Sequence, residues 1–318
     1  MKNIIKKIFK HPDLINKPPV LIDIGASGSI FSGWELIAPY SICISFDADA
    51  RDFEVTDSLD SGYKRLISLN RLVDVNKHDE SDFYLTKSPH CSSGLKPDQD
   101  SLRNWSFHDL FEVTDKVALP TTTIAETLNS FKLDYVDWFK VDSQGQDLRL
   151  FCSVPNHMKG GVIALDFEPG IIDAYHGEDK LFDILAWMER QPFWLEDFRV
   201  KGVPRQHSAK VPESFGLAGR SRMYWSKSSP CWAELSYLNS FTELQSVRSL
   251  LLGWIIATMR GQHEFASIVA EKGLANGSSP ELFGEMLDFS SRTIGLYSSN
   301  LSIIAFIFSR VFDKIFSR

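Results

Sequence analysis

Three apolar runs of the sequence end in an aspartate. VLIDI carries Asp23 just before the small residues 25–28 (GASG), while SICISF is followed by Asp47 and YVDWFKV by Asp142. A carboxylate at a strand end can accept hydrogen bonds from ribose hydroxyls, and small residues in a turn let a ligand approach the backbone. This combination of residues is typical of a nucleotide-cofactor site.

The glycine spacing narrows the choice of cofactor. The turn lacks the middle and late glycines of G-x-G-x-x-G, which argues against a bound pyrophosphate and hence against NAD. The carboxylate that precedes the turn suits a cofactor with a sulfonium and an amino group, which favours S-adenosylmethionine. A plain tight turn with a solvated aspartate remains the alternative. We expect the cofactor to contact Asp23, Gly25, Ala26, Ser27, Gly28 and Asp47.

Acid–base chemistry could come from a second group of residues. Asp142 ends a strand beside the glycine turn, His176 follows the last parallel strand, and His90 lies in the polar loop HCSSGL. The alternatives are a helix cap for Asp142 and solvated loop positions for both histidines. Glu168 is a fourth candidate for the base, but with Asp142 it has no metal-ligand spacing, so we predict no metal site.

The elements that must position these residues follow from the alternation of apolar runs and helical patterns. Crossover units of this kind predict a mostly parallel sheet. Two further runs, 193–200 and 221–227, predict an antiparallel pair at one edge, and the loop 202–219 between them is expected to cover the pocket. The expected strands are 20–24, 41–46, 64–69, 135–142 and 161–168, and the expected helices are 32–38, 122–131, 145–154 and 178–190.

The pattern changes after Pro230, where two amphipathic helices joined near Gly261 are followed by more helix. We therefore predict three parts: a basic amphipathic segment (1–18), a Rossmann-like α/β domain (19–229) and an α-helical appendage (230–318). The α/β domain combines a mostly parallel sheet with an antiparallel edge hairpin.

Composition excludes several partners and compartments. The net charge of −7 with scattered basic residues is unsuited to nucleic acid. The four cysteines are far apart and the first residues lack a signal-peptide pattern, so a cytoplasmic protein is expected. The tail 301–318 has helical apolar spacing, which predicts a helix that either packs on the protein or lies on a membrane surface.

Five motifs together resemble the FkbM-family methyltransferases. The resemblance covers Pro19 to Ser226, and its most specific parts are K-V-D-x-Q-G and the Y-x-G-x-x-x-L-F run from Tyr175 to Phe182. It implies a Rossmann-like sheet and S-adenosylmethionine as cofactor. The family pattern commonly has glutamate at the position of Gln144. The motifs are DIGASGS, FDADA, HCSSGL, KVDSQGQDLRLF and DFEPGIIDAYHGEDKLFDIL.

Two functions are compatible with these observations. The first is an S-adenosylmethionine-dependent O-methyltransferase that acts on a hydroxyl of a glycan or other secondary metabolite. The second is a non-catalytic adaptor that keeps the fold and binds a protein partner or a membrane through its helical appendage. Glycine and aspartate together at three strand ends favour the enzyme, because an adaptor needs none of them.

Overall fold

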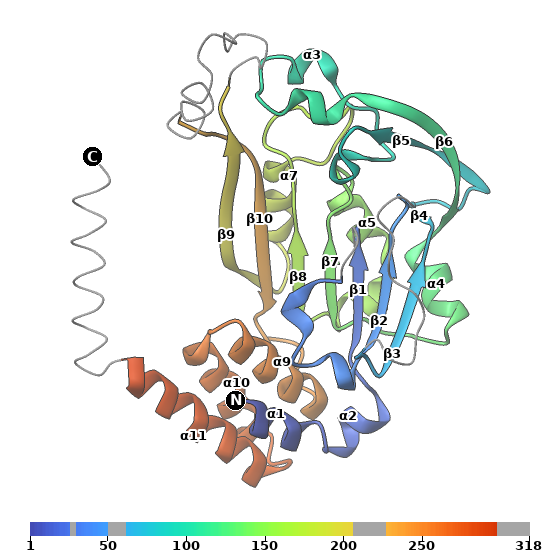
Figure 1. The fold of residues 1–318 in the computed structure, drawn as a ribbon. Helices are drawn as coiled ribbons and strands as arrows, with labels where there is room; N and C mark the ends of the chain where they lie inside the picture. The colour runs from blue at the N-terminus through green and yellow to red at the C-terminus, as the bar shows by residue number, and fades with distance from the viewer. Residues whose placement is uncertain (26–29, 50–61, 206–226, 298–318) are drawn as a thin grey trace. The chain divides into compact units, whose positions relative to one another are not determined.

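The computed structural model describes residues 1–25, 30–49, 62–205 and 227–297 (Figure 1). The chain forms two compact units, Pro18–Ser240 and a second unit made of Met1–Lys17 and Phe241–Arg318. We call them the sheet unit and the helical unit. The amino-terminal segment is thus part of the helical unit. The boundary predicted at residue 230 moves to residue 240, because strand β10 (Ser229–Asn239) completes the sheet.

The sheet unit contains the predicted Rossmann-like sheet, with seven strands in the order β3-β2-β1-β7-β8-β10-β9. The first five strands are parallel, and β10 runs antiparallel to both of its neighbours. The order reverses at β1, so the crevice beyond its carboxyl end is the place where such sheets bind ligands. The remaining strands are β1 (Val20–Ile24), β2 (Ile42–Phe46), β3 (Arg65–Leu69), β7 (Trp138–Val141), β8 (Ala164–Phe167) and β9 (Phe193–Val203).

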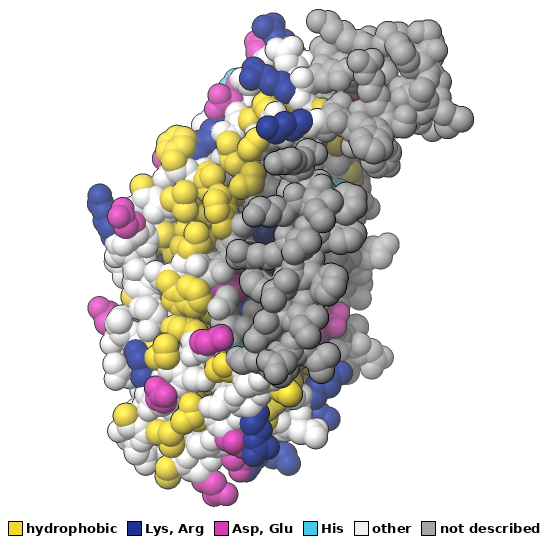
Figure 2. All heavy atoms as spheres, turned by 90° about the vertical axis from the view of Figure 1, so that its left-hand side faces the viewer, with side chains coloured by type: hydrophobic (Ala, Val, Ile, Leu, Met, Phe, Trp, Pro, Cys, Tyr) yellow, Lys and Arg dark blue, Asp and Glu magenta, His cyan; other side chains and the backbone are white. Residues whose placement is uncertain are grey.

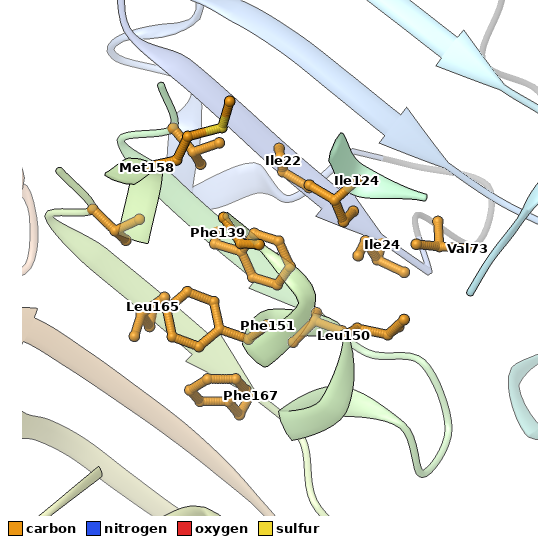
Figure 3. Close-up of a cluster of buried hydrophobic side chains, with 14 of the residues drawn as sticks. Ile22, Ile24, Val73, Ile124, Phe139, Leu150, Phe151, Met158, Leu165 and Phe167 are labelled. Carbon is orange, nitrogen blue, oxygen red and sulfur yellow. The ribbon is translucent and has the colours of Figure 1, made fainter. Parts of the chain in front are cut away.

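A continuous core fixes these strands against the helices (Figure 3). Phe151 of α5 packs between Phe139 of β7 and Phe167 of β8, with ring centroids 5.3 and 5.8 Å apart. This contact holds the start of α5 at the strand ends. The crossover helices are α4 (Ile124–Ser130), α5 (Asp147–Ser153), α6 (Asn156–Lys159) and α7 (Leu181–Met188). The helix predicted at 32–38 is instead two 3₁₀ turns, η1 (Ser32–Trp34) and η2 (Ala38–Tyr40).

A smaller three-stranded sheet, which the sequence did not predict, lies beyond the carboxyl ends of the parallel strands (Figure 1). Strand β6 pairs in parallel with β4 and antiparallel with β5. The segment between β5 and β6 contains short helical turns, and some of its residues line the site described below. The elements are β4 (Leu72–Val73), β5 (Glu80–Thr86), β6 (Val113–Thr122), η3 (Pro89–Cys91), α3 (Gln99–Leu102) and η4 (His108–Phe111).

The helical unit has the two predicted helices joined near Gly261, which has a positive φ of +77°. Its α9 is buried around most of its length, in keeping with a central position in this unit. No helix in the described ranges is long and apolar enough to cross a bilayer. The helices are α1 (Lys2–Ile8), α2 (Pro12–Asn16), α9 (Val247–Met259), α10 (His263–Ala275) and α11 (Pro280–Tyr297).

Strand β9 forms one edge of the large sheet. Leu195, Phe198 and Val200 on this strand are exposed, and hydrophobic side chains gather on the face of the molecule shown in Figure 2. Arg199 and Lys201 interrupt the apolar positions of the strand, and charged residues of this kind discourage edge-to-edge pairing.

Candidate functional site

Asp23 of β1 and Lys140 of β7 form a buried ion pair near the carboxyl ends of their strands. The Asp23 side chain is completely buried, its Oδ1 lies 3.0 Å from Lys140 Nζ, and its Oδ2 accepts a hydrogen bond of 2.9 Å from Phe31 N. Burial opposes the charge of Lys140, but the nearby carboxylates of Asp23 and Asp142 outweigh it and raise the lysine pKa. Lys140 therefore stays charged beside Asp23, at the carboxyl end of β1.

Gly25 is required by a close approach of two backbones. Its φ is +80°, and a Cβ at this position would lie 2.0 Å from the carbonyl oxygen of Asp142. Its N–H donates to Phe46 O over 2.9 Å. The absent side chain thus lets the ends of β1, β2 and β7 converge.

A first cavity lies at this convergence, beyond the ends of β1 and β2. Gly25, Asp47 and Asp142 contribute to its wall, and its volume is about 70 Å³. Asp47 Oδ1 accepts a 2.9 Å hydrogen bond from Asp49 N, which orients the carboxylate in the turn after β2. The opposite wall is apolar and comes from the smaller sheet, through Leu72, Val73 and Phe83.

Asp142 is held by a short chain of polar contacts. Its Oδ1 accepts a 2.6 Å hydrogen bond from Gln144 Nε2, and the hydroxyl of Tyr175 lies within 3.0 Å of Gln144 Oε1. The same hydroxyl is 2.9 Å from Cys91 O. Gln144 has a φ of +57°, a costly conformation for a residue with a side chain, and such strain is often found at functional sites.

A second, larger cavity of about 450 Å³ lies beyond β7 and β8. Its wall includes Glu168, at the end of β8, and Trp232 of β10. His90, Asp142 and Gln144 line both cavities. A molecule in the first cavity and one in the second would therefore approach the same three side chains.

Asp147 joins the ends of β7 and β8. Its Oδ1 accepts from Ser143 N (3.0 Å) and Ser143 Oγ (2.6 Å), and its Oδ2 accepts from Glu168 N (2.8 Å). Burial raises the pKa of Asp147 to about 6, against these hydrogen bonds, which lower it. Asp147 thus sets the spacing between the two strand ends that carry Asp142 and Glu168.

Glu168 faces the second cavity in an unfavourable environment for its charge. Burial, together with the negative charges of Asp142 and Asp147, raises the pKa of Glu168 to about 9. The carboxyl group of Glu168 therefore carries a proton at neutral pH. A protonated carboxyl next to a second carboxyl is an arrangement that can both donate and accept protons.

The other predicted site residues differ in whether they line the two cavities. His90 is exposed and lines both cavities, whereas His176 lines neither; its side chain is 58% exposed and its Nδ1 lies 3.8 Å from Asp98 Oδ2. Asp23 lies on β1 and is not among the described residues that line the first cavity. Ala26, Ser27 and Gly28 lie outside the described residues, as do most of the expected cover loop 202–219 and strand 221–227.

Sequence reasoning missed the polar contacts that shape the second cavity. Glu178 Oε1 accepts from Ala174 N (2.6 Å) and lies 2.7 Å from Lys180 Nζ, which fixes the loop that carries Tyr175. Tyr175, Glu178 and Lys180 belong to the Y-x-G-x-x-x-L-F motif. The sequence therefore indicated the motif, but it did not indicate these contacts. In the described parts of the chain, no group of three or more His, Cys, Asp or Glu could hold a metal ion.

Comparison of the chain with protein-family models gives no match, and comparison with curated proteins gives none either. The resemblance to the FkbM family therefore stays a prediction from the motifs.

Proposed function

We propose that this protein is an S-adenosylmethionine-dependent methyltransferase, similar to the FkbM family, that acts on a hydroxyl group of a small-molecule or glycan acceptor. The main support is that His90, Asp142 and Gln144 line both cavities. Group transfer needs a donor and an acceptor held next to each other, with catalytic side chains at the junction. The two adjoining cavities have this arrangement.

The first cavity has suitable chemistry for the cofactor. The carboxylate of Asp47 can accept hydrogen bonds from ribose hydroxyls, and Leu72, Val73 and Phe83 offer an apolar surface to a flat base. Cavities that enclose drug-sized ligands have volumes of about 300–1,000 Å³. Because the first cavity measures about 70 Å³ and is lined, in the described part of the chain, by residues such as Gly25 and Asp49, binding of a whole cofactor must widen it.

The chain's own side chains would then manage the proton of the acceptor. S-adenosylmethionine supplies an electrophilic methyl group on a positively charged sulfur. The acceptor hydroxyl must lose its proton as its oxygen gains the methyl group, and we assign this proton to the Asp142 carboxylate. Gln144 orients that carboxylate through Oδ1. Glu168, which keeps its own proton at neutral pH, can donate a hydrogen bond to the acceptor oxygen.

We also propose that the protein works in the cytoplasm and that residues 301–318 contact a membrane surface peripherally. The support is the helical spacing of apolar residues in this segment, with charged residues between them. These residues lie outside the described part of the chain.

Titration calorimetry on the full chain tests the cofactor assignment. We expect saturable binding of S-adenosylmethionine, and of its demethylated product S-adenosylhomocysteine, without binding of NAD under the same conditions. Binding of NAD alone would show that the site binds a dinucleotide and would contradict the S-adenosylmethionine assignment. If no compound binds, the enzyme proposal fails and the adaptor alternative remains.

A further inference from the structure

The second cavity has an aromatic wall built from separate elements of the sheet unit. The ring of Phe107 lies 5.1 Å from Phe111 and 6.3 Å from Trp232, and Phe111 lies 5.6 Å from Tyr175. All four residues line the cavity, together with Ile172. Offset and edge-to-face aromatic contacts of this kind make a rigid apolar surface.

This wall is fixed by backbone hydrogen bonds. The N–H groups of Ile171 and Ile172 both donate to Cys231 O, over 2.8 and 3.2 Å, so the loop beyond β8 is attached to β10 beside Trp232. The Tyr175 hydroxyl is engaged with Cys91 O and Gln144 Oε1. The chain's own contacts thus hold the aromatic surface in place.

The charged side chains among the described residues that line the same cavity are all acidic. Asp142, Glu168 and Glu178 contribute carboxyl groups, and no lysine or arginine is found among the described residues that line it. Glu178 is neutralised by Lys180, whose Nζ lies 2.7 Å away. This leaves the Asp142 carboxylate, at the junction with the first cavity, and the Glu168 carboxyl group in the second cavity.

We propose that the acceptor is an uncharged molecule with an apolar, preferably aromatic body, and that the second cavity rejects phosphorylated or carboxylated molecules. An anion that leaves water needs cations or several N–H donors in exchange, and an apolar wall beside a carboxylate offers neither. A neutral ring that carries a hydroxyl buries its body against Phe107 and Trp232 and directs the hydroxyl to Asp142. This inference depends on the proposed function and specifies its substrate class.

Two probes that share the naphthalene ring, one neutral and one anionic, test this inference. The full chain is titrated with 2-naphthol and with 2-naphthyl phosphate at pH 7, without added cofactor, so that the result is independent of the cofactor assignment. We expect saturable binding of 2-naphthol and binding of the phosphate weaker by at least about tenfold. Absence of 2-naphthol binding, or phosphate binding of equal strength, would overturn the proposal.

Two variants locate the binding. Trp232→Ala removes part of the aromatic wall and should weaken 2-naphthol binding by about tenfold or more. Phe182→Ala is the matched control, because Phe182 is 67% exposed on α7 and is not among the residues that line the cavity. An equal loss in both variants, or no loss in Trp232→Ala, would show that the probe binds elsewhere and would contradict the assignment.

Discussion

At the scale of single residues, Gly25 has a structural role in addition to the one that its sequence context indicates. The sequence predicts that small residues leave space for a ligand, whereas a Cβ on Gly25 would meet the Asp142 carbonyl oxygen. Gly25 is therefore needed because it lets the ends of β1 and β7 approach each other. The first cavity depends on that convergence, so a side chain here would disturb the cavity through the backbone.

Gly25→Ala should therefore destabilise the protein more than a glycine substitution that changes conformation alone. Gly177→Ala is the control, because Gly177 has a φ of +73° but a Cβ added to it would meet no atom within 4 Å. We expect Gly177→Ala to cost about 1–2 kcal/mol and Gly25→Ala about 2–3 kcal/mol more, from overpacking. Urea unfolding of both variants measures the difference, and equal losses would contradict the close approach.

Glu168 gives a pH-dependent prediction. Its folded pKa is raised above its value in the unfolded chain, so the folded state loses stability as the pH rises between the two values. Glu168→Gln removes this penalty and should raise the unfolding temperature more at pH 8.5 than at pH 5.5. The exposed Glu80→Gln is the control. A gain for Glu168→Gln that is independent of pH would contradict the raised pKa.

Site residues could be predicted from the sequence only where a polar residue directly follows a recognisable apolar strand. Asp47 and Asp142 follow apolar strands, and both line the first cavity. The two histidines carry no such signal, because a loop histidine can point either way: His90 lines both cavities and His176 neither. The contact between Gln144 and Tyr175 joins residues 31 positions apart and depends on tertiary packing.

At the scale of elements, Asp147 is the link between two strand ends. Its carboxylate accepts from three donors, and an asparagine amide would direct N–H groups toward at least one of them. Asp147→Asn should therefore cost about 1–3 kcal/mol of folding stability. It should also weaken the binding of 2-naphthol, because Glu168 would no longer be fixed. Thermal unfolding and calorimetry measure the two effects, and wild-type values in both would refute this role.

Four of the strands that the sequence predicted are mostly apolar runs. β1 is buried at every position, and β2, β7 and β8 nearly so, which makes them easy to recognise. β6 is mostly exposed and its sequence, VTDKVALPTT, mixes polar and apolar residues with a proline, so it showed no strand pattern. β10 begins with Ser-Pro and contains Ala-Glu-Leu, and it becomes a strand because it pairs with both β8 and β9.

At the scale of the whole molecule, the division into two units predicts that the tail and the cofactor site are independent. Removal of residues 301–318 should leave the affinity for S-adenosylmethionine unchanged, because the described residues that line both cavities all belong to the sheet unit. Flotation of the full-length and shortened chains with anionic vesicles tests the proposed membrane contact. If the full-length chain does not float, the interfacial-helix proposal is wrong.

The central claim is that the carboxyl ends of β1 and β2 hold S-adenosylmethionine. Calorimetry with this cofactor on the wild type, Asp47→Ala and the control Asp82→Ala tests it most directly, with circular dichroism to show that each variant is folded. Asp82 is exposed on β5 and pairs with Lys116. We predict that Asp47→Ala weakens binding by about 1–3 kcal/mol, or about 5- to 150-fold, while Asp82→Ala binds normally. Unchanged affinity in a folded Asp47→Ala protein would contradict the claim.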